Sequence, residues 1–452
     1  MMKKPEVIVF VIADSLRYDV CYPGIKKLMP YLSSCSTHFH QVRSPACWTL
    51  PSHASMFSGL WPHTHGANTQ IRKVRKDYPV LAEQLKSKGY YTAMITTNVV
   101  VTDIFGVNRG FDETHKIWKE IPDQGAQWLY AMLGYLWRPR FRKRVVKTFI
   151  SRKQSDDIEN LRIFFRGYGP DIFTMARERI ETLRKKKKKK IFLFLNFYDT
   201  HFPYHTQDRF TLDAPGLKKI PEFMQLIDVI NNTHLMKNNY QPNMRIMPHI
   251  KDRQRRAFER FAPMMDSFAQ WIREEIPNST IVFGSDHGEN FGEEQWLYHF
   301  ANVTEGGNRV PLLWSSSGQT RKKEIKKPVS LMNVYNSFCY ETGAGQKKDR
   351  WHLVQHPEKS LSVIQAYWYN ANGKTAPIFK RNQFAFNTDR RKYIYRDNTW
   401  YEIPVDNDSK THALPLSNKT NPVEEVRMSA QLKKDLLKVW NEYQAFERTV
   451  PF

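Results

Sequence analysis

Residues 7–15 read VIVFVIADS, a run of apolar side chains that ends in an acidic residue and a serine. A strand that is covered on both faces, as in a parallel sheet, has this near-continuous apolar pattern. Two later stretches, IFLFLNFYDTH at 191–201 and STIVFGSDHGE at 279–289, repeat the pattern and also end in polar or acidic residues. Three such strands predict an open α/β sheet whose candidate ligands lie along one edge, at the carboxyl ends of the strands.

The pattern of apolar and polar residues changes at about residue 345. Before that point, residues 78–98 indicate an amphipathic helix, a glycine and a strand, which is one αβ unit. After it, short alternating segments predict a small antiparallel sheet, and residues 429–446 predict a helix that packs across the sheet. We therefore expect a large domain over 1–345, a basic and partly amphipathic insertion within it at about 120–190, and a small α+β subdomain over 346–452.

The composition indicates a globular protein with an excess of positive charge. The 452 residues are 41% hydrophobic and 13% aromatic, and the formal net charge is +24 at pH 7. Such a composition excludes disorder of the whole chain, and the length allows more than one domain. The four cysteines have neither metal-ligand nor paired spacing. Their scatter argues against a disulfide framework or a zinc knuckle and favours a reducing compartment.

Much of the positive charge lies in two runs, residues 138–153 and 184–190. Such runs suit nucleic acid, an anionic membrane or a polyanionic substrate, or they form solvated loops. The first run follows an aromatic, apolar stretch, so residues 126–153 predict either peripheral contact with an anionic membrane or a packed helix with a basic flank. No stretch reaches the roughly 18 to 20 apolar residues that span a bilayer. We expect a cytoplasmic protein that is at most peripheral at the inner membrane face.

Three polar side chains follow two of the apolar strands directly. Asp14 follows the first strand, and Asp286 and His287 follow the strand that begins near residue 279. Any single one of them is more often a cap or a turn residue. Two carboxylates and an imidazole at one sheet edge, however, suit a divalent cation. We expect one ion and leave open whether it is Mn²⁺, Ca²⁺, Zn²⁺ or Mg²⁺.

Residues 49–60, TLPSHASMFSGL, predict a loop that enters a helix. Pro51 is tolerated in the first helical turn, and Thr49 lies just before it. A side-chain oxygen there faces free backbone N–H groups and the positive end of the helix dipole, which suits an anion. If the expected cation also binds this oxygen, the hydroxyl loses its proton more easily, as metal-bound water does. Thr49 is then a candidate nucleophile, and otherwise it is an ordinary helix cap.

Five motifs together resemble the sulfatase branch of the alkaline phosphatase superfamily. They are IADSLRYD at 12–19, SPACWTLPSHASMFSGLWPHTHG at 44–66, NFYDTHFPY at 196–204, GSDHGENFG at 284–292 and TEGGNRVPLL at 304–313. The resemblance covers about residues 6–315, and residues 391–408 resemble the C-terminal sheet of that family. It implies an α/β fold with a mixed, largely parallel sheet flanked by helices, followed by a small C-terminal antiparallel sheet with a helix.

Carried over to this chain, the resemblance implies a role for each candidate site residue. The implied set comprises Asp14, Thr49, Asp286 and His287 as ligands of one divalent metal ion, Thr49, His201 and His299 as catalytic residues, and His53 and Asn98 as substrate-binding residues. His201 would hold the anionic oxygens of the substrate or assist the leaving group, and His299 would serve the leaving oxygen. Arg309 would brace the site. Asp199 and His205 fit a second metal site poorly, so we expect a single ion.

The nucleophile segment departs from the sulfatase pattern. Sulfatases have C/S-x-P-x-R, in which the Cys or Ser becomes formylglycine and the Arg supports it, whereas this chain has Thr49 and His53 at those positions. Cys47 lies two residues too early to substitute, and Asn98 stands where a lysine or histidine is expected. A threonine does not yield the aldehyde. Other branches of the superfamily, including phosphodiesterases and phosphoglycerol or phosphoethanolamine transferases, use an unmodified threonine to attack phosphorus.

We therefore expect a metal-dependent hydrolase or transferase that uses Thr49 on a phosphoester, within an anionic glycan, lipid or cell-envelope precursor. Three alternatives remain. A sulfuric ester hydrolase would have the same fold and would turn over aryl sulfates. A non-catalytic relative would keep the fold as a basic module that binds polyanions, and the intact set of Asp14, Thr49, Asp286 and His287 argues against it. A nucleic-acid-binding protein would rest on the lysine run alone, and because no recognition motif accompanies that run we expect no specific nucleic acid partner.

Overall fold

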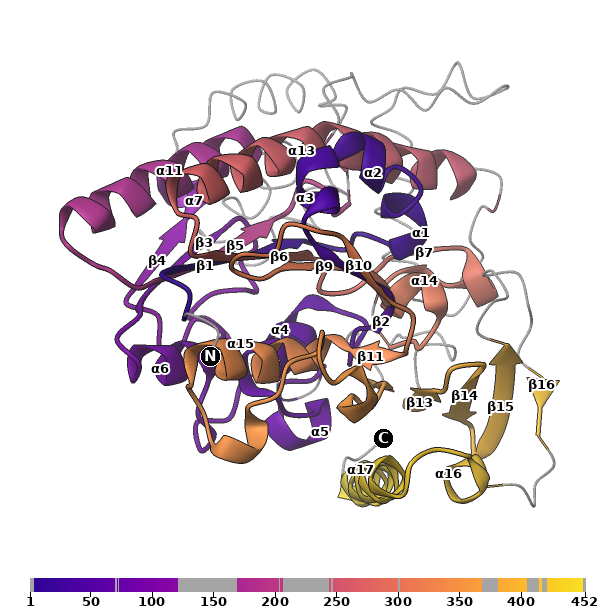
Figure 1. The fold of residues 1–452 in the computed structure, drawn as a ribbon. Helices are drawn as coiled ribbons and strands as arrows, with labels where there is room; N and C mark the ends of the chain where they lie inside the picture. The colour runs from indigo at the N-terminus through magenta and orange to yellow at the C-terminus, as the bar shows by residue number, and fades with distance from the viewer. Residues whose placement is uncertain are drawn as a thin grey trace, which may run out of the picture.

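A nine-stranded sheet forms the centre of the molecule (Figure 1). The computed structural model describes residues 4–69, 71, 73–120, 169–202, 204–205, 244, 247–299, 301–367, 381–404, 414–416 and 421–449. The strands are β1 (Val7–Ala13), β2 (Thr37–Arg43), β3 (Tyr91–Thr96), β4 (Glu113–Lys116), β5 (Ile191–Phe197), β6 (Ser279–Gly284), β9 (Arg309–Ser315), β10 (Lys323–Ile325) and β11 (Val329–Ser330). Their order is β10-β2-β9-β6-β1-β5-β3-β4, and β11 also pairs with β2.

The sheet is mixed and largely parallel, as predicted. Strand β9 runs antiparallel to β2 and β6, and every other pairing in this sheet is parallel. Strand β1 lies between β5 and β6, and all seven of its residues are buried. Val9 and Val11 pack into the core on one face, and Ile8 and Phe10 pack into the core on the other. Burial on both faces explains why its sequence is apolar throughout rather than alternating.

Helices cover both faces of this sheet (Figure 1). One face packs against the long helices α11 (Gly169–Lys185) and α13 (Met247–Glu275) and against the short α1 (Tyr18–Cys21), α2 (Ile25–Leu28) and α3 (Pro30–Ser34). The other face packs against α4 (Thr49–Ser58), α6 (Leu81–Lys86) and α15 (Val334–Thr342). Smaller elements at the periphery are α5 (Pro62–His65), α7 (Ile117–Glu120), α14 (Glu305–Asn308) and the pair β7 (Asn290–Phe291) and β8 (Leu297–Tyr298).

The predicted C-terminal sheet and helix are present. Five antiparallel strands follow in chain order: β12 (Val363–Ala366), β13 (Gln383–Asn387), β14 (Arg391–Arg396), β15 (Thr399–Pro404) and β16 (Leu414–Pro415). Helices α16 (Pro422–Glu425) and α17 (Ala430–Thr449) lie on one face of this small sheet (Figure 1). Its other face packs against Cys47 and Val303 of the large part. The division into domains at residue 345 stays a prediction.

Charged and polar side-chain contacts join the small sheet to the large part. Lys392 of β14 is buried and donates to Glu305 of α14 over 2.8 Å, and the same carboxylate pairs with Arg43 at the end of β2. Gln383 of β13 donates to the carbonyl of Ala301 over 2.7 Å. These contacts hold the small sheet beside the segment that follows β2 and leads to α4.

The predicted basic insertion lies mostly outside the described residues. This is also true of the proposed membrane-contact segment 126–153, which stays a prediction. The lysine run 184–190 includes the end of α11 and the turn that enters β5, and its side chains up to Lys189 are exposed. Among the described helices, none combines the length and the apolar character that crossing a bilayer requires.

Candidate active site

Four neighbouring strands deliver the candidate residues to one edge of the sheet. Strands β6, β1, β5 and β3 lie side by side and run parallel. The residues that follow their carboxyl ends are Asp286 and His287 after β6, Asp14 after β1, His201 after β5 and Asn98 after β3. Parallel strands end at the same edge, so residues that are far apart in the sequence meet there.

Asp14, Asp286 and His287 form a cluster that could hold a metal ion. One potential ligand atom from each lies within 4.8 Å of the others, and all three side chains are fully buried. Nε2 of His287 lies 3.7 Å from Oδ1 of Asp14 and 3.4 Å from Oδ2 of Asp286. Nδ1 of His287 donates to the carbonyl of Gly288 over 2.8 Å. This bond fixes the tautomer, so that Nε2 turns its lone pair toward the carboxylates, as metal-ligating histidines require.

The chemistry of this cluster fits a divalent cation. Oδ2 of Asp286 is buried and accepts no hydrogen bond from any residue that the structure describes. Burial, with the nearby Asp286 carboxylate, raises the pKa of Asp14 to about 8, and burial raises the pKa of Asp286 to about 7. Two buried carboxylates are costly without a counter-charge, and a cation bound between them would remove this cost. Among the described residues, this is the one group of three or more such ligands.

Hydrogen bonds hold the Asp14 carboxylate in place. Oδ1 accepts from the hydroxyl of Ser15 over 3.0 Å, and Oδ2 accepts from Nδ2 of Asn98 over 2.6 Å. The side-chain oxygen of Asn98 in turn accepts from the backbone N–H of Val100 over 2.8 Å. The Asn98 amide therefore contacts a candidate metal ligand in this structure. Its predicted role in substrate binding stays a prediction.

Thr49 is the first residue of α4, and its hydroxyl lies beside the cluster. Its Oγ1 is 3.2 Å from Nε2 of His287. The residue before it, Trp48, occupies the cap position without a side-chain cap hydrogen bond. Thr49 therefore does not serve as the cap of this helix.

His53 lies one helical turn beyond Thr49 and is completely buried. Its Nδ1 donates to the carbonyl of Thr49 over 2.9 Å and lies 3.5 Å from Oδ2 of Asp286, and its Nε2 lies 3.4 Å from Nδ2 of Asn196. Burial lowers the pKa of His53 to about 3, so the ring is neutral at pH 7. The predicted substrate contact of His53 stays a prediction, because the structure gives this ring contacts with the protein.

Cys47 does not join the cluster. Its thiol accepts from the backbone N–H of Asn302 over 3.2 Å, and its side chain packs with residues of the small sheet. Cys47 is only two positions before Thr49, but the side chains of the two residues pack against different parts of the protein. This agrees with the interpretation that Cys47 does not replace the nucleophile.

Two further imidazoles lie beside His287. The ring centroids of His287 and His299 are 4.5 Å apart, and those of His201 and His299 are 5.1 Å apart. Nδ1 of His299 donates to Glu289 over 2.8 Å, and Nδ1 of His201 donates to the carbonyl of Phe202 over 2.7 Å. Burial lowers the pKa of both rings, that of His299 to about 3. Both rings are therefore neutral at pH 7. Because Nδ1 of each ring carries the proton, Nε2 is the hydrogen-bond acceptor of each ring.

Comparison with known proteins identifies the family. The family model described as Sulfatase matches residues 6–343, which is most of the chain. The chain belongs to the sulfatase family.

The relatives of this sulfatase-family chain are distant in sequence. The choline-sulfatase of Rhizobium meliloti (strain 1021) is 23% identical over 413 residues, which cover 82% of this chain and 73% of the relative. A solved structure of a 2-O GAG sulfatase covers 99% of this chain and 94% of its own, with a TM-score of 0.61 and 13% identity. The structure of the phosphonate monoester hydrolase of Agrobacterium radiobacter aligns with 99% of this chain over 96% of its own length, with a TM-score of 0.58 and 15% identity. The predicted family and fold are confirmed.

Membership in this family makes the chain a hydrolase. Sulfatases act on esters, and the structural neighbours include both sulfatases and a phosphonate monoester hydrolase. The same fold therefore serves chemically related esters, and the similarity alone does not choose among them.

Two residues beside the site of this sulfatase-family chain, Glu289 and Tyr198, were not predicted from the sequence. Glu289, two positions after His287, is fully buried and accepts from both His299 and the hydroxyl of Tyr204. The hydroxyl of Tyr198 donates to Nε2 of His201 over 3.2 Å, and the two rings stack 3.9 Å apart. Both residues lie within the motifs quoted from the sequence, so their place near the site could have been predicted. Their hydrogen-bond partners depend on tertiary contacts, which a sequence motif does not specify.

Arg309 lies at the start of β9 and contacts residues away from the cluster. Its guanidinium donates to the carbonyl of His40 over 2.9 Å and lies 4.3 Å from the centroid of the Tyr18 ring. The structure records no contact of this side chain with the Asp14, Asp286 and His287 group among the described residues. Its bracing role stays a prediction. Asp199 and His205 likewise form no second group of metal ligands in the described part of the chain.

Proposed function

We propose that this chain is a metal-dependent phosphoester hydrolase or transferase in which Thr49 is the nucleophile. The observation that carries the proposal is the position of the Thr49 hydroxyl, 3.2 Å from Nε2 of His287 and next to two buried carboxylates. The family's aldehyde cannot form from threonine, so the nucleophile has to be the hydroxyl itself. A hydroxyl that attacks phosphorus forms a phosphothreonine and needs only positioning and charge stabilisation.

Asp14, Asp286 and His287 would hold the ion, with the oxygen of Thr49 as a fourth ligand. A divalent ion in this position would stabilise negative charge as a Lewis acid and would make the hydroxyl of Thr49 more acidic. The backbone of Thr49, which carries this hydroxyl, is held in place because Nδ1 of His53 donates to the Thr49 carbonyl over 2.9 Å. We propose that His53 and Asn98 position Thr49 and Asp14, in place of the substrate contacts that the family resemblance implied.

His299 is the proposed carrier of the proton. With Nδ1 donating to Glu289, the neutral ring has an acceptor at Nε2. This atom takes the proton of the Thr49 hydroxyl as Oγ1 bonds to phosphorus, and it then gives the proton to the leaving oxygen as the phosphorus–oxygen bond breaks. In the second half, Nε2 takes a proton from water or an alcohol as that oxygen bonds to phosphorus, and it gives the proton to Oγ1 of Thr49 as the bond between Oγ1 and phosphorus breaks. Glu289 orients the ring.

His201 is proposed to contact the oxygens of the transferred group. Its ring lies 5.1 Å from that of His299, and Tyr198 stacks on it. Because Nδ1 is committed to the carbonyl of Phe202, the ring faces the site with Nε2 and its Tyr198 partner. On binding of the substrate, the hydroxyl of Tyr198 would donate to one of these oxygens in place of Nε2 of His201. The substrate is proposed to be an anionic ester, linked to a glycan or a lipid, in keeping with the net charge of +24.

A sulfuric ester hydrolase is the second candidate. The observation that favours it is the family itself, together with the choline-sulfatase relative and the GAG sulfatase neighbour. In that case the Thr49 hydroxyl would attack sulfur directly. The absence of an arginine at position 53 weighs against it, because the buried, neutral His53 lacks the permanent charge of the family's arginine.

Turnover of chromogenic esters by the purified full chain separates the candidates. The substrates are bis-p-nitrophenyl phosphate, p-nitrophenyl phosphate, a p-nitrophenyl phosphonate and p-nitrophenyl sulfate, each with Mn²⁺, Zn²⁺, Ca²⁺ or Mg²⁺ and with a chelator. The proposal expects metal-dependent turnover of a phosphorus ester that is lost in Thr49→Ala and retained, at a reduced rate, in Thr49→Ser. Turnover of the sulfate alone would favour the second candidate, and full activity of Thr49→Ala would overturn both.

A further inference from the structure

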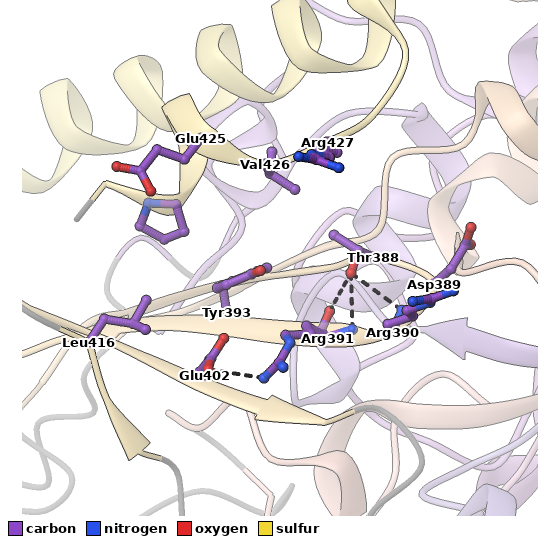
Figure 2. A pocket seen from close by; sticks show the side chains of 11 residues that line it. Thr388, Asp389, Arg390, Arg391, Tyr393, Glu402, Leu416, Glu425, Val426 and Arg427 are labelled. Atoms are coloured by element: carbon purple, nitrogen blue, oxygen red, sulfur yellow. Dashed lines mark hydrogen bonds and ion pairs between the residues drawn. The ribbon is translucent and has the colours of Figure 1, made fainter.

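The small sheet carries a pocket of about 570 Å³ that the candidate active site does not use (Figure 2). Its walls come from the turn between β13 and β14, from β14 and β15, and from the residues around α16. The lining residues are Thr388, Asp389, Arg390, Arg391, Tyr393, Glu402, Leu416, Pro422, Glu425, Val426 and Arg427. Volumes of this order are typical of small-molecule sites.

Three arginines line this pocket. Arg390 comes from the turn and Arg391 is the first residue of β14, whereas Arg427 faces them from the segment after α16 (Figure 2). Arg391 pairs with Glu402 over 2.9 Å. The side chains of Arg390 and Arg427 are exposed, and neither guanidinium has an ion pair or hydrogen bond with any described residue. Asp389, the acid nearest to them in the sequence, lies 3.9 Å from Lys327 instead.

The turn that carries Arg390 is held by its own hydrogen bonds. The hydroxyl oxygen of Thr388 accepts from the backbone N–H of Arg391 over 3.0 Å and donates to the carbonyl of Arg391 over 3.0 Å. The backbone N–H of Thr388 donates to the same carbonyl over 2.8 Å. Figure 2 shows the hydrogen bonds of the Thr388 hydroxyl meeting at its oxygen. A fixed turn spares an oxyanion ligand part of the entropy cost of ordering its binding groups.

The rest of the pocket is apolar with two carboxylates at its edges. Tyr393 is half-buried, and its ring stacks on Phe386 with 4.9 Å between the centroids. Leu416, Pro422 and Val426 complete the apolar surface, while Glu402 and Glu425 provide hydrogen-bond acceptors. A stacked aromatic ring is a flat, rigid contact surface. A ligand that matches this lining has an oxyanion at one end and a ring with hydroxyl groups on the other.

We propose that this pocket binds a sugar that carries a sulfate or phosphate group. Arg390 and Arg427 would take the oxyanion, because guanidinium groups bind planar sets of oxygens through paired N–H donors. The sugar ring would lie on Tyr393, and its hydroxyls would donate to Glu402 and Glu425.

The pocket is separate from the candidate active site. Side chains alternate along β14, and Lys392 reaches Glu305 of the large part, whereas Arg391 and Tyr393 line the pocket on the side of α16. The proposed carbohydrate site therefore lies on the small sheet, apart from the candidate active site. It does not depend on Thr49 or on which ester is cleaved.

Calorimetric titration of the full chain tests this assignment. The ligands are N-acetylglucosamine 6-sulfate, N-acetylglucosamine 6-phosphate, N-acetylglucosamine and inorganic sulfate. The variants are Arg390→Ala, Arg427→Ala and Tyr393→Ala, with Arg448→Ala as the matched control. Arg448 is an exposed arginine of α17 in the same subdomain, so it removes the same charge without touching the pocket.

Binding of both charged sugars is expected, with no detectable binding of the neutral sugar and weaker binding of inorganic sulfate. Each arginine variant should weaken binding by about tenfold or more, and Arg448→Ala should leave it unchanged. Thr49→Ala should also leave it unchanged, which separates this site from the candidate active site. Binding that is unaffected in both arginine variants, binding of the neutral sugar with equal affinity, or no binding at all would overturn the proposal. Both arginines are exposed, and unchanged thermal unfolding of their variants verifies that the fold is intact.

Discussion

The hydroxyl oxygen of Thr49 lies 3.2 Å from Nε2 of His287, although 238 positions separate the two residues in the sequence. The parallel strands β1 and β6 place Asp14 and His287 at one sheet edge, and α4 begins beside that edge. A hydroxyl, two carboxylates and an imidazole thus meet in a buried part of the molecule. Electrostatic interactions are stronger in such a site than in solution, which is what nucleophile activation requires.

Replacing Asp286 by asparagine should abolish the response of the protein to metal ions. In chelator, Asp286→Asn should be at least as stable as the wild type, because the change removes a buried carboxylate whose Oδ2 accepts no hydrogen bond within the described part of the chain. Added Mn²⁺ should raise the unfolding temperature of the wild type and leave that of the variant unchanged. Differential scanning calorimetry with and without the ion measures both effects. An equal rise in both proteins would place the ion elsewhere.

Asn98→Ala distinguishes a positioning role from a substrate contact. The change removes the 2.6 Å hydrogen bond to Asp14 Oδ2, so the metal affinity should fall by about 10- to 100-fold. Saturating metal should restore much of kcat. A raised KM for ester with unchanged metal affinity would instead support the substrate contact that the family resemblance implied. Metal titrations and steady-state kinetics on the same preparations separate the two results.

The buried charges between the two sheets should show an asymmetric response to mutation. Glu305 pairs with both Arg43 and Lys392, so Glu305→Gln leaves two buried cations without a counter-charge and should cost about 3–5 kcal/mol of unfolding free energy. Lys392→Met leaves the Arg43–Glu305 pair intact and should cost clearly less. Urea unfolding of the two variants measures the difference. A larger loss in Lys392→Met would contradict this explanation.

Asp199 should make the protein less stable as the pH rises from about 4 to about 7. Burial raises the pKa of this carboxyl to about 6, from 3.8 in the unfolded chain, and the N–H of Gly169 and the charge of Arg260 offset only part of that effect. A carboxyl group whose pKa is higher in the folded protein than in the unfolded chain contributes its full stabilisation of the fold below the unfolded pKa. This contribution is lost as the pH rises through the folded pKa.

Asp199→Asn removes this titration and keeps an oxygen for the N–H of Gly169. The stability of the variant relative to the wild type should therefore increase between pH 4 and pH 7.5, by up to about 3 kcal/mol. Unfolding free energies of both proteins at several pH values give the difference directly, because other titrating groups cancel. A difference that does not change with pH would refute the assigned shift.

Much of the fold could be predicted from the sequence because β1, β5 and β6 are buried on both faces. Their continuous apolar runs leave no polar face, and only a covered parallel sheet accommodates them. The polar residues after these runs then have to lie at one edge. This is why the cluster of Asp14, Asp286 and His287 could be anticipated from strand ends alone.

The hydrogen-bond partners within the site could not be predicted in the same way. The amide of Asn98 and the ring of His53 are directed to Asp14 and to the carbonyl of Thr49, and these orientations depend on how β3 and α4 pack on the sheet. Glu289 is a comparable case, because its partner His299 lies beyond a short β-hairpin. Motif spacing places such residues near the site without specifying which atoms they contact.

Mass spectrometry of the acid-quenched enzyme tests the central claim most directly. The full chain is mixed with bis-p-nitrophenyl phosphate and the most active divalent ion, quenched within the first turnovers and digested. We predict a phosphoryl-type adduct on Thr49 of the peptide that contains residues 44–60, and no adduct in Thr49→Ala. Metal-dependent turnover of the same substrate with the adduct on Cys47, or with no adduct on this peptide and full activity in Thr49→Ala, would contradict the assignment of Thr49 as the nucleophile.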